Sequence, residues 1–60
     1  MRQPKEVLQQ WVEAIQAEGR GVTEWEGKFV QSCAEVLDEG RGLSEKQEEI
    51  LERVYAQRAA

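Results

Sequence analysis

The sequence predicts an all-α protein, a compact three-helix bundle formed by one domain of residues 1–60. Apolar residues recur at the helical spacings of three and four in three separate stretches. The tetrapeptide Glu-Gly-Arg-Gly occurs at residues 18–21 and again at residues 39–42, and each copy is followed by an aliphatic residue, a hydroxyl residue and a glutamate. Each copy is typical of a segment that ends one helix and begins the next. Three helices of similar length with short connections favour a bundle.

The first helix is expected to run from about Gln3 to Glu18. Pro4 suits the first helical position, where its missing N–H costs no hydrogen bond. We expect Gly19 to end the helix by adopting the left-handed conformation. The apolar side chains that repeat with the helical period are Val7, Leu8, Trp11, Val12 and Ile15.

The second helix is expected to run from about Glu24 to Glu39. Thr23 is the predicted N-cap, and Glu26 lies three residues later, as in a capping box. Gly40 is expected to end this helix. The predicted apolar stripe consists of Trp25, Phe29, Cys33, Val36 and Leu37, with Val30 on its flank.

The third helix is expected to run from about Glu45 to Gln57. Ser44 caps it, and Gln47 completes a second capping box. Arg58 falls on the apolar side, where its stem would lie over the core while its charged head reaches water. The predicted core stripe consists of Ile50, Leu51 and Val54, with Tyr55 on its edge.

Composition limits the classes of function. With one cysteine, Cys33, and no histidine, the chain has neither an intrachain disulfide nor the donor set of a zinc site, so we expect no metal and no cofactor. No apolar run approaches the about 18 residues of a membrane span, and the first residues lack the hydrophobic stretch of a signal peptide. The sequence therefore indicates a complete, small cytoplasmic protein. Its net charge of −4 makes nucleic-acid binding unfavourable.

No residue pattern indicates catalysis, so we expect no catalytic residues and no enzyme. Cys33 lies in the middle of an apolar stripe, as a buried thiol does, and no base or cation accompanies it. Neither Gly-Arg-Gly turn has the lysine and spacing of a phosphate-binding loop. The third helix carries four acids that we expect to be solvated surface, because no histidine or metal motif accompanies them. They are Glu45, Glu48, Glu49 and Glu52.

Aromatic residues are the best candidates for binding. Trp25 lies in the first turn of its helix, near a bundle end, and aromatic anchors dominate the energies of protein interfaces. We predict Trp25 and Tyr55 as anchors, with Arg41 and Lys46 as nearby polar contacts. The favoured hypothesis is a non-catalytic protein-interaction module with an unknown protein partner. A homodimer is also open, because so small a core benefits from a second chain.

A nucleic-acid accessory domain is the alternative. It would use four basic residues, Arg41, Lys46, Arg53 and Arg58. A DNA-reading helix must present basic and amide side chains to a groove. The four glutamates of the third helix oppose direct insertion into a groove, so the acidic chain favours a protein partner.

The segment from Val22 to Tyr55 resembles a helical module of small phage and prophage proteins. The residues that carry the resemblance are Trp25-Glu26, Phe29 and the run Leu43-Ser44-Glu45-Lys46-Gln47. Such modules are found alone or appended to phage replication and recombination proteins. The resemblance implies a phage-derived accessory role near DNA metabolism and carries over no catalytic residue.

Overall fold

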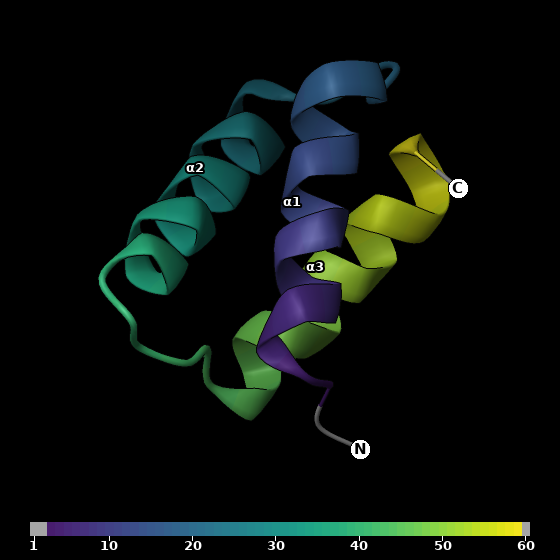
Figure 1. The fold of residues 1–60 in the computed structure, drawn as a ribbon. Helices are drawn as coiled ribbons and strands as arrows, with labels where there is room; N and C mark the ends of the chain where they lie inside the picture. Colours follow the sequence, from purple (N-terminus) through teal and green to yellow (C-terminus); the bar gives the residue numbers. More distant parts are fainter. Residues whose placement is uncertain (1–2, 60) are drawn as a thin grey trace.

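The computed structural model describes residues 3–59, which form three α-helices (Figure 1). They are α1 (Lys5–Glu18), α2 (Glu24–Asp38) and α3 (Glu45–Arg58). The predicted all-α three-helix bundle is therefore confirmed. The first helix begins two residues later than expected, because Pro4 is its N-cap and not its first helical residue. The second ends one residue earlier and the third extends one residue further than predicted.

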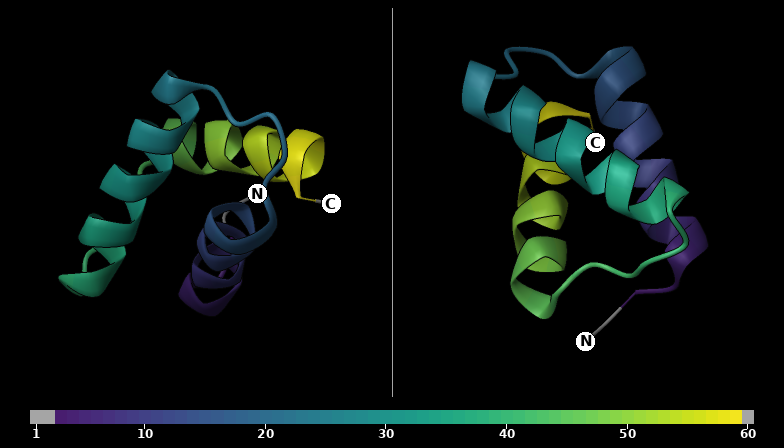
Figure 2. Two further views of the ribbon diagram at one scale, coloured as in Figure 1. Left: turned by 90° about the horizontal axis from the view of Figure 1, so that it is seen from above. Right: turned by 90° about the vertical axis from the view of Figure 1, so that its left-hand side faces the viewer.

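The first helix is the centre of the arrangement. It packs extensively against both neighbours, whereas α2 and α3 contact each other much less (Figure 2). The radius of gyration of the Cα atoms is 10.2 Å. A compact domain of this length is expected to have a value of about 10 Å. The three helices are therefore fully collapsed onto a shared core, although one pair is in sparse contact.

Both predicted capping boxes are confirmed. At the start of α2, the Thr23 hydroxyl accepts a hydrogen bond from the Glu26 N–H at 3.1 Å, and Glu26 Oε1 accepts one from the Thr23 N–H at 2.9 Å. Ser44 and Gln47 make the same reciprocal pair at the start of α3, at 3.1 and 2.9 Å. Because these bonds satisfy N–H groups that a helix leaves unpaired, the residue types fix where each helix begins.

The second helix ends on a left-handed glycine, as predicted. Gly40 has a φ of +81°. Its N–H donates to the Leu37 carbonyl at 3.0 Å, and the Arg41 N–H donates to the Val36 carbonyl at 3.1 Å. This pair of bonds is the Schellman arrangement, which satisfies carbonyl groups in the last turn.

The first helix ends differently, and the prediction for Gly19 is wrong. Gly19 has a φ of −59°, and Gly21 is the left-handed residue, with a φ of +67°. Close packing explains the glycine at position 19. A Cβ atom there would overlap the Ile15 carbonyl oxygen and lie 2.8 Å from Val22 Cγ2. Gly19 therefore lets the chain turn tightly across the end of α1.

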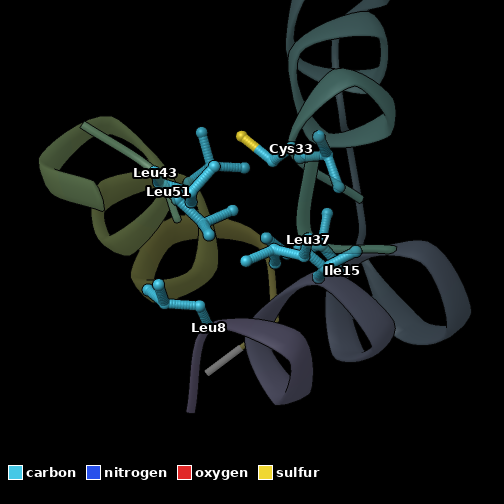
Figure 3. Close-up of a cluster of buried hydrophobic side chains, with 9 residues drawn as sticks. Leu8, Ile15, Cys33, Leu37, Leu43 and Leu51 are labelled. Carbon is cyan, nitrogen blue, oxygen red and sulfur yellow. The ribbon is translucent and has the colours of Figure 1, made fainter. Parts of the chain in front are cut away.

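The core contains residues from all three helices and from the connection before α3. In Figure 3 the labelled side chains converge from these elements on one another. The buried set is Leu8, Val12, Ile15, Val30, Cys33, Leu37, Leu43, Leu51 and Val54.

The buried stripe of α2 is rotated from the predicted one. Val30, predicted on the flank, is 1% exposed, whereas Trp25 is 60% exposed. At 100° per residue, Val30 lies within about 60° of Cys33 and Leu37, and Trp25 lies about 110° from the centre of these three. In α3, Ile50 is also only half-buried.

Glu48 is buried in the structure, so the prediction that its side chain is solvated is wrong. Glu48 is 6% exposed. It lies three residues before Leu51 and thus on the core face of α3. A buried carboxylate requires hydrogen-bond donors, and Glu48 Oε1 accepts one from the Gln3 N–H at 2.8 Å. This bond ties the start of the described chain to α3.

Candidate interaction surface

Two stacked aromatic rings lie at the start of α2. Trp25 is the second residue of the helix and Phe29 follows one turn later. Their ring centroids are 5.3 Å apart and the rings are inclined by 10°. The stack covers one face of the indole. Because Trp25 remains 60% exposed, the other face is open to solvent.

The same face of α2 carries one more apolar residue, Val36, beyond the exposed Ser32. Val36 lies eleven residues after Trp25, within about 40° of both aromatic residues around the helix axis. Phe29 and Val36 are half-buried and pack against the core. We call these three residues, Trp25, Phe29 and Val36, the α2 strip.

The helix that carries the strip is also the most acidic. It has four carboxylates and one lysine, a net charge of −3. The corresponding net charges are −2 for α1, with three carboxylates and one lysine, and −1 for α3, with four carboxylates and three basic residues. Glu35 and Asp38 are exposed and make no ion pair among residues 3–59. Negative charge is therefore concentrated on the same element as the exposed aromatic residue.

The other charges at the start of α2 are already engaged. Lys28 pairs with Glu24 across one turn at 3.4 Å, and both side chains are exposed. Glu26 Oε1 accepts a bond from Arg58 Nε at 3.1 Å. The pKa of Glu26 lies below its ordinary value. The hydrogen bond from the Thr23 N–H is the main cause and Arg58 is a further one, although desolvation acts in the opposite direction. Glu26 is therefore a structural anion.

Arg58, at the end of α3, contacts both the start of α2 and the connection that precedes it. Its guanidinium binds Glu26 in the first turn of α2, with the two side chains only 28% and 13% exposed. Its carbonyl accepts the N–H of Arg20 from the first connection at 3.1 Å. The charged head of Arg58 therefore binds another part of the fold, whereas the sequence predicted that it would reach water.

The four residues predicted for protein binding do not share one surface. Tyr55 is half-buried and stacks on Trp11, with centroids 5.5 Å apart and rings inclined by 24°. It belongs to the contact between α1 and α3. Arg41 pairs with Glu39 at 2.7 Å in the connection after α2, and Lys46 lies in the first turn of α3. The end of α2 and the start of α3 lie at the end of the bundle away from the start of α2 (Figure 1), and Trp25 and Asp38 are about 20 Å apart along α2.

The basic residues of the nucleic-acid alternative are also dispersed. Arg58 binds Glu26 and Arg41 binds Glu39. Lys46 and Arg53 are exposed on α3, in the company of exposed glutamates of the same helix. The structure thus forms no contiguous basic patch from these four side chains.

The remaining features offer little to a reaction. Burial raises the pKa of the Cys33 thiol to about 11, so it is not a ready nucleophile. A hollow of about 690 Å³ lies at the ends of α1 and α3 and includes Arg58, which is bound to Glu26, in its wall. Within residues 3–59, no three or more His, Cys, Asp or Glu side chains gather so as to hold a metal ion. No helix in the same range is long and apolar enough to cross a membrane.

The sequence pointed to Trp25 but did not single out its stacking partner. The signal that could have found Phe29 is its spacing of four from Trp25, which places two aromatic rings on one helix face. No protein-family model, no curated protein and no solved structure matches this chain.

Proposed function

We propose that this chain is a non-catalytic helical module that binds a protein partner through Trp25 and Phe29. The exposure of Trp25 carries the proposal. Among the described residues, it is the large apolar side chain left exposed, at 60%. A tryptophan is a frequent energetic centre of protein interfaces, because burying its ring releases a large apolar area from water.

The proposed surface differs from the set that the sequence suggested. Phe29 joins Trp25, because the two rings form one stacked unit. Tyr55 stabilises the packing of α1 on α3. Arg41 belongs to the connection after α2 and Lys46 to α3, beyond the end of α2 away from Trp25. They are therefore outside the proposed binding surface.

The biological setting that we propose rests on the sequence alone. The pattern from Trp25 to Gln47 suggests a phage-derived accessory protein that acts near DNA metabolism in the cytoplasm. In that setting the module would connect proteins, since its acidic charge opposes direct contact with phosphates.

Capture from a lysate of the source organism tests the proposal. Immobilised wild-type protein, Trp25→Ala and the control Gln31→Ala would be compared after nuclease treatment. Gln31 is an exposed residue of α2 outside the strip. We expect a protein that the wild type and Gln31→Ala retain and that Trp25→Ala loses.

Two outcomes would contradict this function. Equal capture by Trp25→Ala would show that the aromatic surface is not used. Capture that disappears with the nucleic acid would favour the alternative accessory domain and direct attention to Lys46 and Arg53.

A further inference from the structure

We propose that the segment recognised by the α2 strip is a basic amphipathic segment of a partner protein, with an arginine or lysine stacked on the open face of Trp25. This inference rests on the proposed function and names the chemistry of its partner. It follows from the position of the exposed indole on the most acidic helix.

The strip sets the size of the segment. From Trp25 to Val36 it extends over eleven residues, or about 16 Å along α2. A short helix or extended segment with apolar side chains on one side would cover this length, as in other helix-surface complexes. Phe29 and Val36 are already half-buried, so the partner adds a second layer to apolar side chains that contact the core.

The indole favours a cation on its open face. The Phe29 ring covers the opposite face at 5.3 Å. Cations are attracted to the face of an aromatic ring, most strongly to tryptophan, and the planar guanidinium of arginine also stacks on it. The amide groups of the first turn do not recruit an anion to this position, because Thr23 and Glu26 already form the capping box.

Charge provides the complementarity. The net charge of α2 is −3, and its Lys28 is paired with Glu24. Glu35 is exposed further along the helix, whereas Asp38 lies on the opposite flank, toward α1. A positive side chain of the partner would therefore meet Glu35 beside the strip while its apolar side chains cover the rings.

The same charge disfavours other occupants. A second copy seated on the strip would bring two helices of net charge −3 together, which costs free energy. Phosphates of nucleic acids and anionic lipids are repelled for the same reason. The basic residues Lys46 and Arg53 belong to α3, so they do not change the net charge of α2.

Selection from a library of random 12-residue peptides tests the inference. Peptides would be selected on the wild type, with removal of those that bind Trp25→Ala. We expect the surviving peptides to combine Arg or Lys with Leu or aromatic residues. Their affinity should be at least about tenfold weaker for Trp25→Ala and should fall as salt is added.

Matched variants locate the charge. Glu35→Gln should weaken the selected peptides about two- to threefold. Glu52→Gln removes the same charge from an exposed position of α3 and should leave their affinity unchanged. Equal effects of the two variants would overturn the placement of the basic segment on α2.

The outcomes separate this inference from the function on which it rests. Peptides that need Trp25 but are acidic or uncharged would overturn the basic partner and retain the interaction module. The absence of any Trp25-dependent peptide would overturn both. Sedimentation that shows a dimer of the wild type and a monomer of Trp25→Ala would assign the strip to a second copy and overturn the inference.

Discussion

At the scale of single residues, a modest rotation around a helix axis separates core from surface. Val30 and Trp25 both belong to the apolar side of α2, yet one is 1% and the other 60% exposed. Helical periodicity places Trp25 in the apolar stripe because it does not distinguish which apolar residues lie at the centre of the buried face. The actual centre of the buried face is set by which side chains meet Leu43 and α1, and this information is not local.

Gly27 offers a test of local helix energetics. It is exposed within α2, and an added Cβ would find only Val22 Cγ1, at an ordinary 3.9 Å. Alanine restricts the unfolded chain and favours the helix, so Gly27→Ala should raise the free energy of unfolding by about 1 kcal/mol. Urea unfolding at neutral pH measures this change.

Gly19→Ala is the matched control. Its Cβ would overlap the Ile15 carbonyl oxygen and crowd Val22, so the same change of residue should lower the free energy of unfolding. A gain in stability at Gly19 would contradict the close approach seen at the end of α1.

At the scale of elements, contacts between residues close in the sequence were predictable, and contacts between residues far apart in the sequence were not. Both capping boxes follow from residue types three positions apart, and the helices that they begin were placed correctly. The Glu26–Arg58 pair joins residues 32 positions apart, and the bond from the Gln3 N–H to the buried Glu48 joins residues 45 positions apart. Such contacts depend on how the helices pack, which no short pattern specifies.

The link between α2 and α3 has a pH dependence with a defined sign. The pKa of Glu26 is lower in the folded protein, mainly through the Thr23 N–H and also through Arg58. The unfolded chain therefore binds the proton more readily. The stabilisation by Glu26 is present above its unfolded pKa and is lost as pH falls through its folded pKa.

We accordingly expect Glu26→Gln to flatten the acid side of the stability profile. The amide can still accept the Thr23 N–H, as Gln47 accepts that of Ser44. Thermal unfolding of wild type and variant from about pH 7 to about pH 3 would show the two converging as the wild type is protonated. Parallel profiles would mean that Glu26 does not contribute to the acid sensitivity.

At the scale of the whole molecule, the bundle was predictable and its surface assignment only partly so. Three periodic stretches with helix signals at both ends of α2 leave few alternatives to a three-helix bundle. The candidate surface required coordinates, because the exposure of Trp25, its stack on Phe29 and its distance from Arg41 depend on the rotation and packing of α2. From the sequence alone, only Trp25 could be predicted as a residue of this surface.

Urea unfolding of Trp25→Ala separates a binding side chain from a core side chain. Trp11→Ala is the matched control, because Trp11 packs half-buried against Tyr55. We expect Trp25→Ala to stay within about 0.5 kcal/mol of the wild type and Trp11→Ala to lose more than about 1 kcal/mol. A loss of about 3 kcal/mol or more for Trp25→Ala would make Trp25 a core residue and contradict its role in binding.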